Sequence, residues 1–147
     1  LLRPRNIWYA GIIAVVGCIM LYALFMRSPL ELNVIHDRNP LFVTLSDGSV
    51  RNGYIVHILN KTHDDKQYEL TLKGLDNASI KIQSNQEISP DNISVFADSI
   101  GQFRVFVSAP KSLQERRNIV FTIRDKNAEV TEEKTTLFIN LKNSALI

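Results

Sequence analysis

The chain has 147 residues, enough for one ordinary domain, and its composition of 45% hydrophobic and 22% charged residues is typical of a folded protein. Its net charge of +2 depends on Arg3, Arg5 and Arg27, because residues 28–147 carry 14 basic and 15 acidic side chains. Without a basic cluster to neutralise phosphates, nucleic acid is excluded as a partner. The single cysteine, Cys18, excludes a disulfide scaffold.

After a short flank of residues 1–5, residues 6–26 contain no charged side chain. As a helix this run is about 30 Å long, which predicts a transmembrane helix. A cleaved signal peptide is the alternative, but the run is longer than a typical apolar core of such peptides and no Ala-x-Ala follows it. Because the chain does not begin with methionine, we expect a longer chain or a processed product.

Flanking charges predict the orientation of this helix. Arg3 and Arg5 precede it, whereas Arg27 alone follows it with Glu31 nearby. An excess of basic residues marks the cytoplasmic side, so residues 28–147 are expected across the membrane from the cytoplasm. If the source is a Gram-negative bacterium, this places the helix in the inner membrane and residues 28–147 in the periplasm.

Small residues gather on one side of the predicted helix, within an arc of about 120°. They are Ala10, Gly11, Ala14, Gly17 and Cys18. Such a seam indicates close packing against another helix, from upstream in the same chain or from another subunit. The alternative is that these small residues lie on one side by chance. Cys18 and Met20 do not form a copper site, because residues two apart on a helix point in nearly opposite directions.

Residues 27–147 are predicted to be all-β, because short alternating runs are separated by turn residues. The expected strands are Leu30–Ile35, Phe42–Leu45, Val50–Leu59, Gln67–Lys73, Ser79–Gln83, Ile93–Phe96, Gln102–Ser108, Ile119–Arg124 and Thr135–Leu141. Four of them carry alternating apolar rows suited to a core: Tyr54, Val56 and Ile58; Tyr68, Leu70 and Leu72; Phe103, Val105 and Val107; Ile119, Phe121 and Ile123. The pattern favours an immunoglobulin-like antiparallel β-sandwich, with at most one helical turn at Ser112–Glu115.

The predicted domain offers little chemistry. His36, His57 and His63 lack the close spacing of zinc or haem ligands. The sequence His63-Asp64-Asp65 indicates a solvated turn rather than a cation site. No serine has a nucleophile context, so we expect no catalytic, cofactor-binding or metal-binding residue in this segment.

Three stretches carry a resemblance to a known family. They are Leu32-Asn33-Val34-Ile35-His36-Asp37-Arg38-Asn39-Pro40-Leu41, Asp47-Gly48-Ser49-Val50-Arg51-Asn52-Gly53-Tyr54 and Leu59-Asn60-Lys61. Together with the preceding span they resemble the carboxy-terminal region of the FixG/RdxA/CcoG family of cytochrome oxidase accessory proteins. The resemblance implies the last transmembrane helix and the periplasmic immunoglobulin-like domain of such a protein. It also implies an upstream multispanning part with 4Fe-4S clusters, which supports assembly of cbb-type oxidases, including copper handling.

The function predicted for this segment is therefore a non-catalytic, membrane-anchored interaction domain. Its expected partners are the membrane, upstream helices of the same chain and oxidase assembly proteins. The residues that carry the resemblance are expected to be structural: Asp37, Arg38, Asn39, Pro40, Asn52, Tyr54, Asn60 and Lys61. The alternative is a free-standing anchored binding protein or copper chaperone, which is disfavoured because no Met or Cys follows Ser28.

Overall fold

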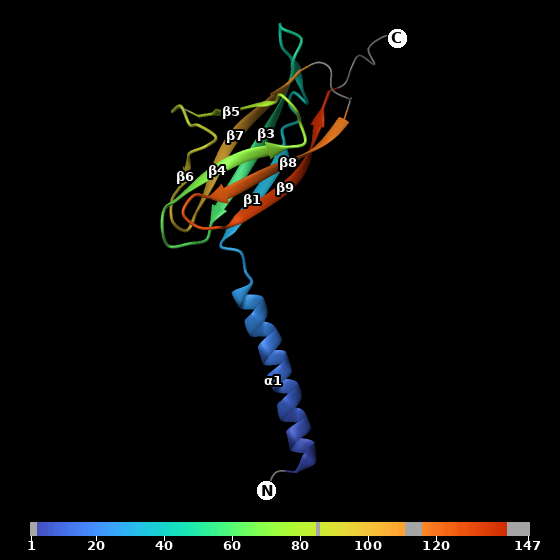
Figure 1. Ribbon diagram of the computed structural model, residues 1–147, viewed down its shortest axis with the longest axis vertical. Coiled ribbons are helices and arrows are strands. Elements are labelled where there is room, and N and C mark those ends of the chain that lie inside the picture. Colours follow the sequence, from blue (N-terminus) through green and yellow to red (C-terminus); the bar gives the residue numbers. More distant parts are fainter. Residues whose placement is uncertain (1–2, 85, 111–115, 141–147) are drawn as a thin grey trace.

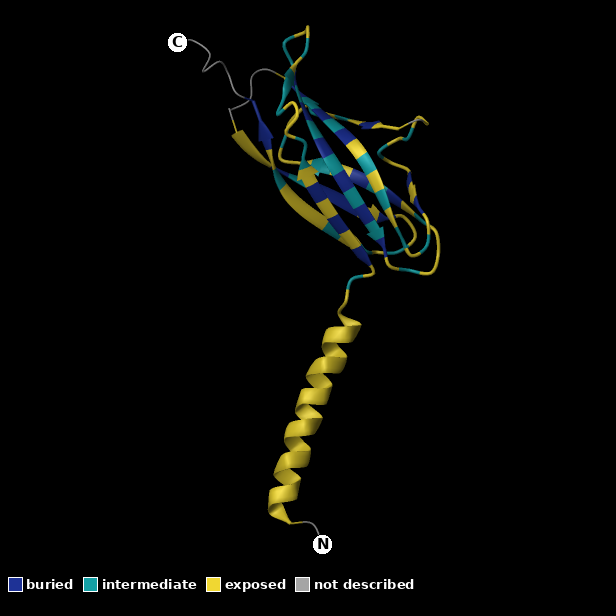
Figure 2. Cartoon of the chain, turned by 180° about the vertical axis from the view of Figure 1, so that it is seen from behind, coloured by how far each residue is buried: buried dark blue, intermediate teal, exposed yellow. Residues whose placement is uncertain are grey.

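A computed structural model describes residues 3–84, 86–110 and 116–140. Its first element is the helix α1, Pro4–Phe25, which projects as a single rod from the β domain (Figure 1). Pro4 suits the first helical turn, where its missing N–H costs nothing. All described side chains of α1 are exposed, and the helix is long and apolar enough to cross a membrane. Figure 2 shows this exposure along its whole length.

The β domain consists of two antiparallel sheets, which confirms the all-β prediction. The first sheet has the order β1-β3-β7-β5, with the short β2 also paired to β3, and the second has the order β6-β4-β8-β9. The strands are β1 Leu30–His36, β2 Val43–Thr44, β3 Val50–Asn60, β4 Lys66–Lys73, β5 Ser79–Gln83, β6 Ile93–Val95, β7 Ser99–Ala109, β8 Arg116–Asp125 and β9 Thr131–Ile139.

The core lies between the sheets and follows the alternation of the sequence. Along β3, every second residue from Val50 to Asn60 is buried, because successive side chains of a strand point to opposite faces. The four predicted apolar rows all face this core, although Leu72 and Phe103 are only partly buried. A fifth row on β1, Phe138 on β9, Ile82 on β5 and the pair Ile93 and Val95 on β6 also belong to it.

Several predicted bounds need correction or lie outside the described residues. Strands β7 and β8 begin at Ser99 and Arg116, three residues before their predicted starts at Gln102 and Ile119. Strand β9 begins at Thr131 rather than Thr135, because its first half, Thr-Glu-Glu-Lys, pairs with β8 while its side chains remain largely exposed and so show no apolar alternation. Its predicted last residue, Leu141, and the predicted turn at Ser112–Glu115 lie outside the described residues.

Candidate functional site

Asn52 and Tyr54 join the two sheets where β1 ends. Both residues lie on β3 and are fully buried. The Asn52 amide donates to the carbonyl oxygen of Ile139 at 2.9 Å and accepts from its N–H at 3.1 Å, as a neighbouring strand would. The Tyr54 hydroxyl donates to the carbonyl oxygen of Leu137 at 2.7 Å. Because β9 is the last strand of its sheet, these side chains satisfy backbone groups at a sheet edge.

Burial raises the pKa of Tyr54 well above its usual value, so the phenol stays protonated and remains a donor. His36 stacks on the Tyr54 ring, with centroids 4.9 Å apart, and Phe121 contacts the ring edge-on. Burial lowers the pKa of His36, against smaller opposite effects of the Leu41 backbone and the Asn52 side chain. A neutral imidazole is therefore favoured, and its Nε2 atom is buried without a hydrogen-bond partner.

The Asp37–Pro40 segment is held against the outer face of the first sheet. The Asp37 N–H donates to the Gly53 carbonyl at 2.9 Å, and its carboxylate accepts from the Asn39 N–H at 3.2 Å. The carboxylate also pairs with Arg104 of β7, and this bond is the main cause that lowers the pKa of Asp37. Arg38 is exposed, and the Asn39–Pro40 peptide bond is cis.

Beside this segment, the outer face carries an aromatic ring between two cations. The guanidinium of Arg51 lies 4.7 Å from the centre of the Phe106 ring, and that of Arg104 lies 5.6 Å from it. Gly53 lies beside the ring, since a Cβ atom there would be in van der Waals contact with Phe106 at 3.4 Å. A hollow of about 540 Å³ adjoins Arg51 and Phe106 and is also lined by Lys81 of β5. We call Arg51, Lys81, Arg104 and Phe106 the cation–aromatic face.

Asn60 has a structural role at the other end of the sandwich. Its amide nitrogen lies within bonding distance of the Asp64, Val95 and Phe96 carbonyls, at 2.8, 3.3 and 3.2 Å, and its oxygen accepts from Thr62. The side chain thereby ties the β3–β4 turn to the β6–β7 turn. Lys61 pairs with Glu31 at 2.8 Å, which lowers the pKa of that carboxyl.

Among the described residues, the other candidates from the sequence do not come together into a metal site. Within the described residues, no group of three or more His, Cys, Asp or Glu could hold a metal ion. His63 contacts Asp98 at 2.7 Å, and Asp65 accepts from the Ala97 N–H, so the His63-Asp64-Asp65 turn bonds a neighbouring turn. On α1, a Cβ atom at Gly11 or Gly17 would meet nothing within 4 Å. The packing seam stays a prediction.

The geometry agrees with comparisons to known proteins. Residues 20–140 match the family model described as "IG-like fold at C-terminal of FixG, putative oxidoreductase". The chain belongs to the FixG family. It is 43% identical to the nitrogen fixation protein FixG of Rhizobium meliloti over 111 residues, which are 74% of this chain and 21% of that protein. It is 31% identical to protein RdxB of Cereibacter sphaeroides over 140 residues, 92% of this chain and 29% of RdxB.

A solved structure gives the same fold. The FixG-related protein from Vibrio parahaemolyticus matches with a TM-score of 0.65 and 30% identity, over 77% of this chain and 97% of that one. The immunoglobulin-like assignment is thus confirmed. This FixG-family chain spans only about a fifth to three tenths of the length of the curated relatives above.

Sequence reasoning missed the cation–aromatic face. Alternation alone places Arg51, Arg104 and Phe106 on outward positions of their strands. Their meeting depends on the register between β3 and β7, which pairs Gly53 with Phe106 and Ile55 with Arg104. The signal available beforehand was the glycine in the middle of an otherwise bulky strand, which often marks a close approach.

Proposed function

We propose that the chain is the last transmembrane helix and periplasmic interaction domain of a FixG-type accessory protein that supports assembly of cbb-type cytochrome oxidases. Membership of the FixG family and the apolar helix α1 support this proposal. In the proposed topology, Arg3 and Arg5 stay in the cytoplasm and the sandwich folds in the periplasm.

The observation that carries the proposal concerns the segments that resemble the FixG family: their polar side chains bond the backbone of the sandwich itself. Asn52, Tyr54 and Asn60 direct their polar groups to backbone atoms inside the sandwich. They build a rigid frame instead of converging on a substrate. Outside this frame, the cation–aromatic face presents two arginines and an aromatic ring together, and arginine and aromatic residues are enriched at protein interfaces.

The chemistry of the complete protein would then lie upstream of residue 1. We propose that 4Fe-4S clusters held there carry the redox role, including copper handling, and that this segment contributes no catalytic group. A cluster of that kind needs several thiolates, whereas this chain has only Cys18. The sandwich would position the upstream unit or hold a partner.

The test is complementation in a bacterium that depends on a cbb-type oxidase and lacks the complete gene. One plasmid carries the full gene, a second stops after Arg27, and a third carries Arg51→Ala with Lys81→Ala. We expect full oxidase activity from the first, little from the second and reduced activity from the third. Full activity from the gene that stops after Arg27 would contradict a role for the sandwich.

A control separates a contact defect from a folding defect. Asn33→Ala changes an exposed side chain on the same outer face, toward the other end of the sheet. We expect it to restore wild-type activity. The Arg51→Ala, Lys81→Ala protein should reach the wild-type level in membranes while oxidase activity falls.

A further inference from the structure

The linker between α1 and β1 fixes which end of the sandwich lies near the membrane. Only residues 26–29 separate Phe25 from Leu30, so these two residues lie at most about 18 Å apart even when the linker is fully extended. The linker is also bonded to the domain, because Pro29 accepts from the Lys61 N–H at 3.0 Å and the Ser28 hydroxyl bonds the Leu30 carbonyl at 2.7 Å. The β3–β4 turn, which contains Lys61, therefore lies beside the exit of α1.

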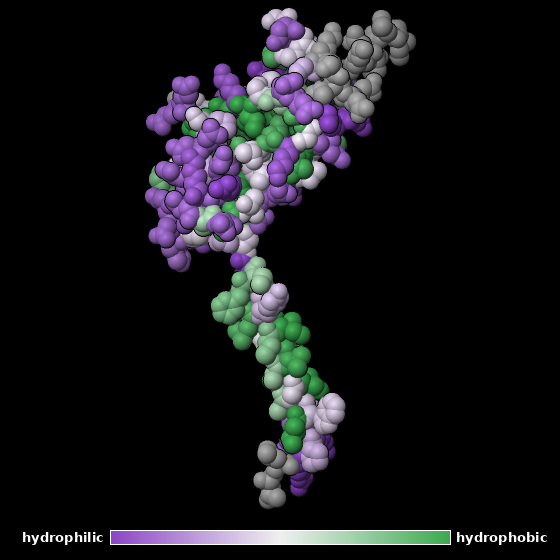
Figure 3. All heavy atoms as spheres, viewed as in Figure 1, coloured by the Kyte–Doolittle hydropathy of each residue, from purple (hydrophilic) through white to green (hydrophobic). Residues whose placement is uncertain are grey.

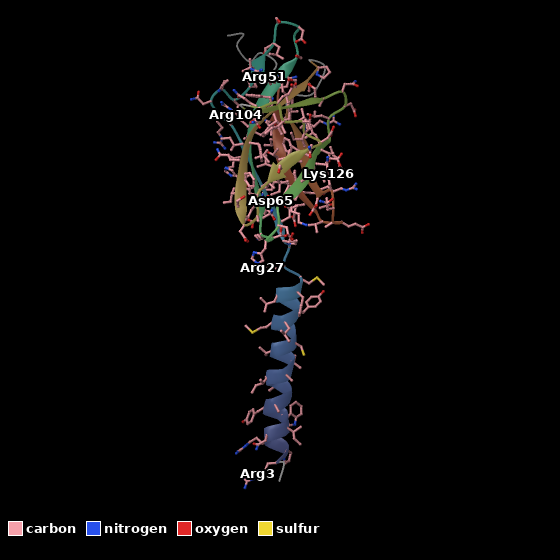
Figure 4. The ribbon with its side chains drawn as sticks, turned by 90° about the vertical axis from the view of Figure 1, so that its left-hand side faces the viewer. Arg3, Arg27, Arg51, Asp65, Arg104 and Lys126 are labelled. Carbon is pink, nitrogen blue, oxygen red and sulfur yellow. The ribbon has the colours of Figure 1, made fainter. Side chains whose placement is uncertain are left out.

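The β6–β7 turn lies at this same end. Its Asp98 N–H donates to the Thr62 carbonyl at 2.9 Å, and its Ala97 N–H donates to the Asp65 carboxylate at 2.8 Å. Figure 4 places Asp65 and Lys126 on the half of the sandwich nearer Arg27, whereas Arg51 and Arg104 lie on the far half. The turn thus shares the end of the domain that α1 tethers.

This turn holds an apolar side chain outward on a rigid backbone. The Phe96 carbonyl accepts from the Asn60 amide and, at 2.7 Å, from the Ser99 hydroxyl. The Phe96 side chain is nevertheless 73% exposed, and Ile100, four residues later, is 63% exposed. Phe96 is therefore presented to the surroundings where four separate bonds fix the backbone of residues 96–98, and Ile100 on β7 adds a second exposed apolar side chain.

Charge at this end gives no strong attraction to anionic surfaces. Lys61 pairs with Glu31, and His63 pairs with Asp98. Asp64 and Asp65 add negative charge in the same turn, which offsets the positive charge of Arg27 and Lys126, and Lys66 pairs with Asp125. Figure 3 shows largely hydrophilic side chains over the visible face of the sandwich, in contrast to α1. Any contact with lipid must then rest on apolar insertion rather than on phosphate neutralisation.

We propose that the sandwich rests on the outer surface of the bilayer that α1 crosses, with Phe96 inserted among the lipid headgroups. The inference rests on the proposed membrane span. A tether of this length keeps the turn close to the lipid, and bulky apolar rings are stabilised at the membrane interface. The contact would fix the tilt of the domain and hold the cation–aromatic face away from the membrane.

The chain allows a direct test, because Trp8 is its only tryptophan. The full chain is reconstituted into phosphatidylcholine vesicles with and without brominated acyl chains, which quench nearby tryptophan. Native Trp8 reports whether α1 is inserted. Phe96→Trp in a Trp8→Phe background reports the β6–β7 turn. Leu137→Trp in the same background is the matched control. Leu137 lies on β9, is 43% exposed, and is located toward the end of the sandwich that is far from α1.

We expect quenching of Trp8 and of the tryptophan at position 96, whose emission also shifts to the blue, and no quenching at position 137. Quenching of Trp8 without quenching at position 96 would overturn the inference and leave the span intact. An unquenched Trp8 would overturn the span and the inference with it. Equal quenching at positions 96 and 137 would also overturn the inference, because the contact would then not belong to this end.

Discussion

The helix and the sandwich differ in where their apolar side chains lie: those of the helix are exposed, and those of the sandwich are mostly buried. Every described side chain of α1 is exposed, whereas the sandwich buries alternate residues of β3 completely or nearly so. The sandwich therefore contains the partner for its own apolar side chains. The helix has no such partner among the described residues, and a bilayer or further helices would supply one. The following predictions test this difference.

The largest effect is expected in the core of the sandwich. Phe121 is fully buried and contacts the Tyr54 ring. Phe121→Ala should lower the free energy of unfolding by about 3–5 kcal/mol, because it removes apolar contacts and leaves a cavity. Denaturant unfolding of the full chain in detergent measures this. Phe96→Ala is the control, since an exposed side chain should change stability by no more than about 0.5 kcal/mol.

In the helix, a charge should affect the membrane and leave the sandwich unchanged. Val15 lies near the middle of α1. Val15→Arg should disfavour insertion by about 3 kcal/mol, the typical cost of arginine at the centre of a span. Alkaline extraction of membranes measures the inserted fraction. An inserted fraction equal to that of the wild type would show that α1 does not depend on lipid.

The sheet-edge bonds should contribute less than the core. Asn52→Ala leaves the buried N–H and carbonyl of Ile139 without their side-chain partner, so we expect a loss of about 1–3 kcal/mol. Tyr54→Phe removes one hydrogen bond and should cost about 1 kcal/mol. Thermal unfolding of both variants ranks them. A larger loss for Tyr54→Phe than for Asn52→Ala would contradict the edge-strand role of Asn52.

The smallest effect concerns pH. The pKa of His36 is lowered by burial, so the unfolded chain takes up this proton at a higher pH than the folded chain does. Acidification from about pH 7 to 5 should therefore reduce stability, because the unfolded histidine titrates near pH 6.5. His36→Gln should flatten this dependence.

His63 should affect the pH dependence of stability in the opposite direction. Asp98 raises the pKa of His63, so its contribution to stability is present at low pH and is lost as the pH rises through the folded-state pKa. His63→Gln should therefore steepen the loss of stability on acidification. If His36→Gln instead lost stability more steeply on acidification than the wild type, the folded protein would not disfavour the protonated form of His36.

Much of the architecture was predictable from local patterns. All nine strands and the four apolar rows follow from alternation and turn residues, because a strand with one buried face must alternate. The Asp47-Gly48 turn follows from residue type as well, and Gly48 has a positive φ of 84°. The first half of β9 could not be predicted, since exposed Thr, Glu and Lys pair through their backbones alone.

The candidate surface was less predictable because it depends on contacts distant in the sequence. The structural role predicted for Tyr54 agrees with its bond to Leu137, but that partner lies 83 residues away. The partner of Asp37 is Arg104, on β7. No pattern within one strand specifies which residues of another strand lie opposite. The packing seam on α1 remains a prediction, because the described residues bury none of its side chains.

The central claim, that the sandwich lies across the membrane from the amino terminus, is tested by thiol labelling of spheroplasts with intact inner membranes. In a Cys18→Ser background, Ser46→Cys places a thiol on an exposed turn of the sandwich, and Asn6→Cys places one at the start of α1. A membrane-impermeant maleimide should label Ser46→Cys but label Asn6→Cys only after lysis. Labelling of Asn6→Cys alone before lysis would contradict the account.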